Sequence, residues 1–167
     1  GAGWAAERGC AHRIDIHMGT LGKSLGSSGG FVAASAEIID HFLNEARTFL
    51  YGTAPAPAAM AAATEALAVL GSAEGNRLRE NLRRNILLYA SLHPASRQGP
   101  IQPWILKSND VTVRARNHLR SLGLEVAAIR PPTVPEGTAR LRISLSARHS
   151  PAEVRRLVEE LARFPAE

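Results

Sequence analysis

Several short stretches of the chain alternate apolar and polar residues, which is the pattern of a strand with one buried face. The clearest is 140–146, in which three aliphatic side chains alternate with two arginines and two serines. Comparable short stretches predict strands at 14–18, 29–34, 101–106 and 124–129. We therefore expect at least one small sheet whose aliphatic face packs against helices.

Longer segments with apolar residues three and four positions apart predict helices between these strands, at 58–70, 74–92 and 111–122. Ser35 suits the N-cap of a further helix over 36–46, and Ser150 with Glu153 has the spacing of a capping box for the final helix. The expected buried stripe of the helix at 36–46 is Ile38, Ile39, Phe42 and Leu43. Alternating strands and helices predict an α/β protein with at least two layers, and we expect two domains, 1–73 and 74–167.

Composition narrows the class of protein without naming a function. The chain has 167 residues with 45% hydrophobic and 21% charged residues, which is typical of a globular protein. It has no long apolar segment and no signal-peptide pattern, and its single cysteine, Cys10, excludes an internal disulfide, so we expect a cytoplasmic protein. The net charge of +5 is spread over expected helices and aromatic residues make up only 5%, so a nucleic-acid partner is not expected. The chain does not start with methionine, and we expect it to be part of a longer protein.

A glycine-rich stretch at 19–30 contains one lysine, Lys23, together with several hydroxyl side chains. Glycines allow a tight turn with free backbone N–H groups, and such a turn suits a phosphate. The lysine could clamp that phosphate, could be solvated in an ordinary turn, or could form an imine with a carbonyl cofactor. A nucleotide-binding loop requires a glycine where this chain has His17, which argues against the first alternative. We favour the imine.

A second loop, 130–138, contains three prolines, which fix its backbone and could hold Thr133 against a ligand. Just beyond it, Arg142 lies on the alternating strand, where a guanidinium could recognise a carboxylate in a bidentate manner. From periodicity alone, we favour the interpretation of Arg142 as an ordinary exposed arginine on a strand. The six histidines have no metal-ligand spacing, so we interpret them as surface or packing residues and expect no metal.

Three stretches together, 20–26, 51–55 and 128–142, resemble the α-oxoamine synthases, which are fold-type I enzymes dependent on pyridoxal phosphate. The resemblance runs from about residue 1 to residue 164 and covers only the second half of a family chain. It implies the end of a large transferase domain, similar to that of aspartate aminotransferase, followed by a small C-terminal α/β domain. The stretch at 129–135 is most similar to the members that condense L-alanine with a pimeloyl thioester in biotin synthesis.

The resemblance also implies a role for each matching residue. Lys23 would hold pyridoxal phosphate through an imine and act as the catalytic base, and Thr20 would contact the phosphate. Gly52 and Thr53 would reach the cofactor phosphate of the partner subunit in a homodimer. The substrate residues would be Thr133 and Arg142, the latter pairing with the carboxylate of the amino acid.

One departure limits what this stretch could do alone. The family aspartate that holds the pyridine nitrogen belongs to an Asp-x-Ala-His pattern that this sequence lacks, and Asp15 lies too near Lys23 to replace it. We therefore expect the stretch alone to be inactive and the activity to belong to the complete chain. Two alternatives stay open: another α-oxoamine synthase such as glycine C-acetyltransferase, and a non-catalytic module that keeps the fold.

Overall fold

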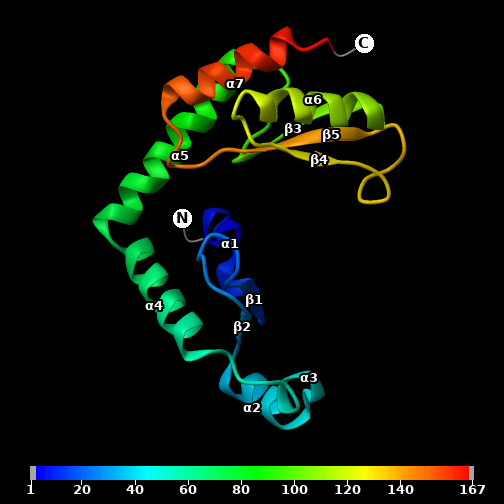
Figure 1. Cartoon of the computed structure of the whole chain (residues 1–167). Helices are drawn as coiled ribbons and strands as arrows, with labels where there is room; N and C mark the ends of the chain where they lie inside the picture. Colours follow the sequence, from blue (N-terminus) through cyan, green and yellow to red (C-terminus); the bar gives the residue numbers. More distant parts are fainter. Residues whose placement is uncertain (1–2, 166–167) are drawn as a thin grey trace. The chain divides into compact units, whose positions relative to one another are not determined.

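The computed structural model describes residues 3–165, which form mixed helical and strand structure (Figure 1). The chain divides into two compact units, Gly1–Asn76 and Arg77–Glu167. We expect a large and a small domain divided after residue 73, and this assignment stays a prediction. Residues 1–2 and 166–167 of those two domains lie outside the described part of the chain. Within residues 3–165, no helix is both long and apolar enough to cross a membrane.

The first unit is organised around a two-stranded antiparallel hairpin. Strand β1 (His17–Thr20) pairs with β2 (Gly30–Ala33), and Thr20 lies opposite Gly30. A short helix, α1 (Trp4–Glu7), and the 3-10 turn η1 (Ala11–Arg13) precede it. The strand predicted at 14–18 begins at residue 17 in the structure, because the ladder starts only where β2 supplies a partner.

Three helices follow the hairpin: α2 (Ala36–Glu45), α3 (Arg47–Leu50) and α4 (Pro57–Gly71). The helices predicted at 36–46 and 58–70 are confirmed. The predicted stripe of α2 is only half-buried at Ile38, Ile39 and Phe42, and Leu43 is 46% exposed. The physical reason is that α2 packs mainly on the four-residue α3, which is too short to cover its apolar face.

Helix α4 gives way to α5 (Ala73–Leu92) at a corner made by Ser72 and Gly75. The Ser72 hydroxyl donates to the Val69 carbonyl at 2.7 Å and accepts from the Gly75 N–H at 3.2 Å, so Ser72 satisfies backbone groups of both helices. A Cβ on Gly75 would lie 2.3 Å from the Val69 carbonyl oxygen and 2.7 Å from that of Leu70. The corner therefore requires glycine at position 75.

We expect Gly75→Ala to destabilise the corner, although alanine favours a helix by roughly 1 kcal/mol relative to glycine. The new methyl group meets backbone carbonyls, which cannot rotate away, and overpacking of this kind costs roughly 1–3 kcal/mol. Gly71→Ala is the matched control, because a Cβ there meets nothing within 4 Å, and we expect it to be neutral or stabilising. Urea unfolding and hydrogen exchange at 69–76 compare the two, and equal stability of both variants would contradict the steric account.

The second unit contains a three-stranded antiparallel sheet in the order β3-β5-β4. Its strands are β3 (Ile101–Lys107), β4 (Ala127–Ile129) and β5 (Ala139–Ser144), with helix α6 (Asn109–Ser121) between β3 and β4 and α7 (Pro151–Arg163) after β5. The capping box of α7 is confirmed, since the Ser150 N–H donates to the Glu153 carboxylate and the Glu153 N–H donates to the Ser150 hydroxyl. Strand β4 is shorter than the predicted 124–129.

One face of this sheet carries the core. Leu141 and Ile143 of β5 are buried on the same face as α5, α6 and α7, while Arg142 between them is exposed on the other face. In Figure 1, α6 lies along one side of the sheet. The core cluster draws on these three helices, the sheet and the segment before β4: Tyr89, Leu106, Ala115, Leu119, Val126, Leu141, Ile143, Leu145, Val154, Leu157 and Leu161. The alternation of 140–146 therefore predicted the buried face of β5 correctly.

Two buried amide side chains fasten loops to this core. The Asn85 amide on α5 donates to the carbonyls of Ser146 and His149, at 2.9 and 2.8 Å, and so holds the connection from β5 to α7. The Gln102 amide accepts from the Arg97 N–H and donates to the carbonyls of Arg97 and Gly99, which closes the loop before β3. Because both side chains are buried and hydrogen-bonded, removing either would leave backbone groups unsatisfied.

Tyr89 of α5 is 1% exposed and stacks on His93 with ring centroids 5.3 Å apart. Burial raises the pKa of Tyr89 to about 12, from an ordinary value of 10.0. The folded state therefore keeps the phenol proton at a pH where the unfolded chain releases it. This contribution to stability is fully present below pH ~10 and is lost as the pH rises towards ~12, at a cost of about 3 kcal/mol.

We expect the free energy of unfolding to fall more steeply between pH ~10 and ~12 in the unchanged protein than in Tyr89→Phe. In Tyr51→Phe, which removes the other of the chain's two tyrosines, the ultraviolet absorbance of tyrosinate should report Tyr89 alone within this chain. Ionisation of Tyr89 near pH ~10 in the folded Tyr51→Phe variant would contradict the effect of burial.

Candidate functional site

Lys23 lies in the loop that joins β1 to β2, at residues 21–29. Its carbonyl accepts from the Gly26 N–H at 3.0 Å, which makes a tight turn, and its side chain is exposed. Leu21 is bonded through its backbone to both Gly29 and Ser27, at 2.9 Å each. Thr20 is the last residue of β1 and is also exposed, so one hairpin presents an amine and a hydroxyl three positions apart.

Glycine is required at three positions of this hairpin for two different structural reasons. Gly26 and Gly29 have φ of 62° and 92°, in the left-handed region that favours glycine. Gly19 lies opposite Phe31 in the ladder, and a Cβ at position 19 would lie 2.4 Å from the Phe31 ring. The sequence indicated a turn here, but the close approach of Gly19 to Phe31 depends on the register of the two strands.

Gly52 and Thr53 follow α3 in the same unit. The Gly52 N–H donates to the Phe49 carbonyl at 3.2 Å, and a Cβ on Gly52 would lie 2.8 Å from the Thr48 carbonyl oxygen. Thr53 is exposed. In the part of the chain that the structure describes, no hydrogen bond joins Lys23 to Gly52 or Thr53. Their predicted role at the partner subunit's cofactor stays a prediction.

Thr133 and Arg142 belong to the second unit, on either side of the start of β5. The Thr133 N–H donates to the Arg130 carbonyl at 3.0 Å, and the Thr133 side chain is exposed. Arg142 lies on the central strand, opposite Pro103 of β3 and Ala127 of β4. Among residues 3–165, no ion pair is found for the Arg142 guanidinium, so it can accept a carboxylate.

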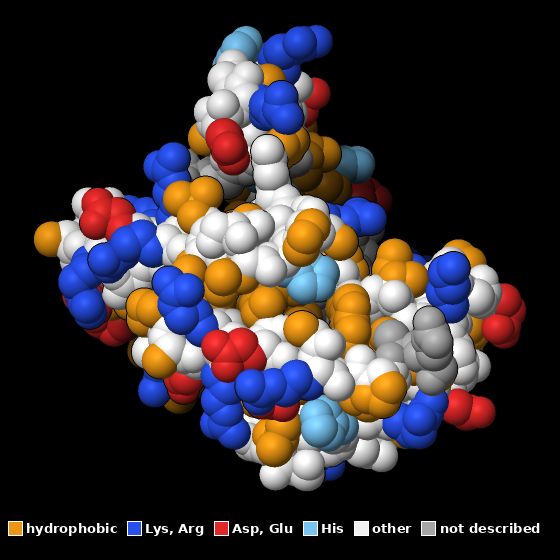
Figure 2. Space-filling model, turned by 90° about the horizontal axis from the view of Figure 1, so that it is seen from above, with side chains coloured by type: hydrophobic (Ala, Val, Ile, Leu, Met, Phe, Trp, Pro, Cys, Tyr) orange, Lys and Arg blue, Asp and Glu red, His pale blue; other side chains and the backbone are white. Residues whose placement is uncertain are grey.

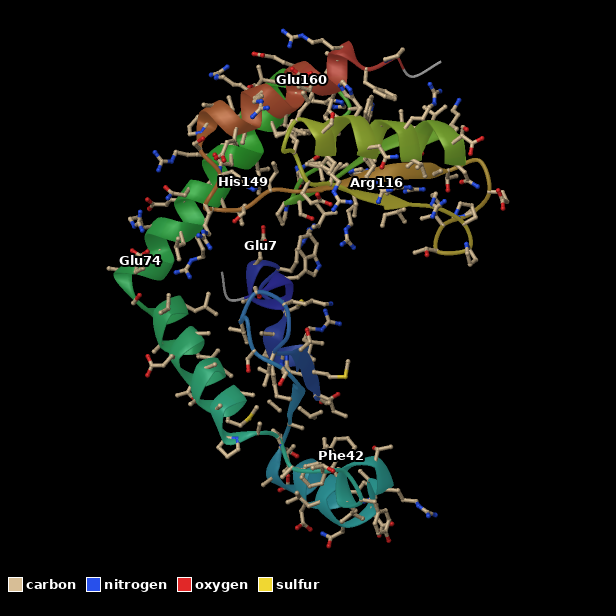
Figure 3. The ribbon with its side chains drawn as sticks, in the orientation of Figure 1. Glu7, Phe42, Glu74, Arg116, His149 and Glu160 are labelled. Carbon is tan, nitrogen blue, oxygen red and sulfur yellow. The ribbon has the colours of Figure 1, made fainter. Side chains whose placement is uncertain are left out.

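A shallow pocket adjoins Arg142 and is also lined by Glu125, Ala127 and His149. The Glu125 carboxylate pairs with the Arg120 guanidinium at 3.4 Å, so it is not a free negative charge beside Arg142. His149 lies in the connection before α7 (Figure 3), where its Nδ1 accepts from the Ser146 N–H at 3.2 Å. Arg142 thus brings to this pocket a guanidinium for which no ion pair is found among residues 3–165.

On the one face that can be seen in Figure 2, the basic side chains do not form a single patch. On the face that Figure 2 shows, lysine and arginine side chains are interspersed with acidic and apolar ones. Of the histidines, His93 stacks on Tyr89 and His118 lies 5.6 Å from the Phe164 ring and 3.8 Å from the carboxylate of Glu160, which Figure 3 labels on α7. These two histidines pack within the second unit, as the sequence predicted.

The chain matches the family model described as aminotransferase class I and II over residues 4–161. A relative from Cupriavidus pinatubonensis named 8-amino-7-oxononanoate synthase is 46% identical over 157 residues, which cover 88% of this chain and 38% of the relative. A relative of the same name from Halorhodospira halophila is 45% identical over 172 residues, which cover 97% of this chain and 42% of the relative. The chain thus spans about two fifths of the curated relatives it matches.

Solved structures show the same fold. Serine palmitoyltransferase from S. paucimobilis, with a bound PLP–myriocin aldimine, has a TM-score of 0.89 at 25% identity and covers 98% of this chain and 42% of its own. An 8-amino-7-oxononanoate synthase from Francisella tularensis has a TM-score of 0.75 at 26% identity and covers 89% of this chain and 44% of its own. The predicted α/β class, as part of a larger transferase fold, is therefore confirmed.

Proposed function

Because the chain belongs to the family of class I and II aminotransferases, we propose that the complete protein acts as an 8-amino-7-oxononanoate synthase. It condenses L-alanine with a pimeloyl thioester, of coenzyme A or of a carrier protein, and releases carbon dioxide. The observation that carries the proposal is the exposed Lys23 amine in a glycine-rich hairpin of a chain about 45% identical to synthases of that name. The proposal includes pyridoxal phosphate as cofactor and a homodimer.

The residues of the hairpin fit the aldehyde and phosphate ends of pyridoxal phosphate. Lys23 offers an exposed amine, and Thr20 offers an exposed hydroxyl on the rigid end of β1. Gly26 and Gly29 keep the loop free of side chains on either side of Ser27 and Ser28. The sequence lacks the Asp-x-Ala-His pattern of the family, so in this proposal the partner of the pyridine nitrogen comes from the rest of the complete chain.

Each proposed residue then has one task. Lys23 would hold the cofactor aldehyde through Nζ, and the same Nζ, when free, would accept the α-proton of L-alanine. Thr20 donates to the cofactor phosphate, and Gly52 with Thr53 does so for the partner subunit. Arg142 orients the carboxylate of L-alanine, and Thr133 contacts substrate. When bound, pyridoxal phosphate supplies the electron sink that stabilises negative charge at the α-carbon.

A second candidate is a serine palmitoyltransferase, which the TM-score of 0.89 favours. Its sequence identity of 25% is well below the 46% of the C. pinatubonensis synthase, so it ranks second. Both candidates use Lys23 in the same way and differ in the amino acid and the acyl chain. Glycine C-acetyltransferase and a non-catalytic module are the remaining alternatives.

The assay that tests the proposal uses the complete protein and pairs L-alanine, L-serine and glycine with pimeloyl-, palmitoyl- and acetyl-coenzyme A, and also with a pimeloyl thioester of a carrier protein. We expect rapid release of free thiol and carbon dioxide only with L-alanine and the pimeloyl thioester, and a product mass equal to 8-amino-7-oxononanoate. A preference for L-serine with palmitoyl-coenzyme A would favour the second candidate. Turnover with glycine as the only accepted amino acid would reject the proposal. No turnover with any pair of amino acid and acyl thioester would reject it as well.

A further inference from the structure

A side-chain hydrogen bond ties the lysine loop to helix α4. The Ser27 hydroxyl donates to the Ala59 carbonyl at 2.5 Å, across 32 positions of sequence, in a half-buried environment. Ala59 lies in the first turn of α4, which begins at Pro57. The hairpin and α4 both belong to the first unit, so this contact is internal to one compact body.

Ser27 also closes the loop from within. Its backbone N–H donates to the Leu21 carbonyl at 2.9 Å, and the turn from Lys23 to Gly26 lies inside the ring that this bond closes. Leu21 is 7% exposed, so the loop is held at one end by a buried side chain and at the other by Ser27. Lys23 itself is exposed, and its position therefore depends on these two attachments.

The helix turn that Ser27 contacts is also the continuation of the Gly52–Thr53 segment. Only a few residues separate Thr53 from Ala59, and Pro55 and Pro57 fix two of their φ angles. A displacement of the first turn of α4 would therefore be transmitted to both segments. The hydrogen bond of Ser27 links the segment that carries the reactive amine to the segment proposed to serve the partner subunit.

We propose that Ser27 is a positioning residue that fixes the Lys23 loop on the first turn of α4 and thereby sets the geometry of the amine. This inference rests on the proposed function, because it concerns how Lys23 is presented to pyridoxal phosphate. Ser27 acts through the loop backbone and does not itself need to touch cofactor or substrate.

The experiment compares Ser27→Ala, Ser27→Thr and Thr64→Ala in the complete protein. Thr64 is the matched control, because its hydroxyl donates to the Met60 carbonyl at 3.0 Å, which lies within α4 and not in the loop. Three quantities are measured: hydrogen exchange at 21–29, the melting temperature without cofactor, and the Kd for pyridoxal phosphate from the absorbance band of the lysine adduct. The first two do not require the loaded enzyme.

We expect Ser27→Ala to speed exchange at 21–29 and to raise the Kd for pyridoxal phosphate roughly two- to tenfold, the range for one lost hydrogen bond. Ser27→Thr, which keeps a hydroxyl, should restore both, and Thr64→Ala should change neither. Unchanged exchange and Kd in Ser27→Ala, with a normal band in the unchanged protein, would overturn this inference alone. Absence of the band from the unchanged protein would overturn the proposed function, and the exchange data would then still decide whether Ser27 fixes the loop.

Discussion

Lys23→Ala in the complete protein is expected to lower kcat by at least about 10³-fold, because one side chain provides both the covalent attachment and the base. The absorbance band of the lysine adduct should disappear, while exogenous cofactor binds more weakly through the remaining contacts. Lys23→Arg should be equally inactive, since a guanidinium keeps the positive charge but does not form an imine with the cofactor aldehyde. Steady-state kinetics and absorbance spectra measure both effects.

The chain offers a matched control for this prediction, because Lys107 is its only other lysine. Lys107 ends β3 in the second unit and has a φ of 64°, a left-handed conformation that asparagine tolerates. Lys107→Asn is therefore expected to keep the absorbance band and kcat. If Lys23→Ala retained the band and Lys107→Asn lost it, the assignment of the reactive amine to the hairpin would be wrong.

Arg142→Ala is expected to raise the KM for L-alanine roughly 10- to 100-fold, the range for losing a hydrogen-bonded pair with a charged group. Arg142 lies on the central strand of its sheet, and among the described residues no ion pair competes for its guanidinium. Arg142→Lys should recover only part of the loss, because an ammonium cannot make the bidentate contact. Kinetics with L-alanine varied at saturating acyl thioester measure the effect.

Arg155→Ala removes the same charge from the exposed surface of α7 and controls for a general electrostatic effect. We expect it to leave the KM for L-alanine within about twofold, since exposed charges interact weakly in water. A rise in the KM of the acyl thioester in Arg142→Ala, with no change for L-alanine, would instead assign Arg142 to the acyl donor.

Local patterns predicted those parts of the fold that depend on neighbouring residues. The Ser150–Glu153 capping box and the alternation through Leu141 and Ile143 both correspond to the structure, since each follows from spacing along one element. The strand at 14–18 was displaced because the ladder partner at 30–33 decides where pairing begins. The stripe of α2 is less buried than predicted because α2 packs mainly on the short α3.

In the candidate site, too, the sequence predicted the local features and missed those that depend on packing between distant segments. Glycines and hydroxyls identified the loop of Lys23, and the structure confirms a tight turn at 23–26 within the connection from β1 to β2. The Ser27–Ala59 bond has no local pattern, because its partners are 32 positions apart and meet only when the hairpin packs on α4. The close approach of Gly19 to Phe31 likewise depends on strand register.

Mass spectrometry of the borohydride-reduced complete protein tests the central claim, that Lys23 carries pyridoxal phosphate, most directly. Reduction converts the imine into a stable amine, so the cofactor mass stays on the residue that held it. We predict the added mass on the peptide that contains Lys23 and none on the peptide that contains Lys107. Finding the cofactor on Lys107, on a lysine elsewhere in the complete chain, or on no lysine at all would contradict the account.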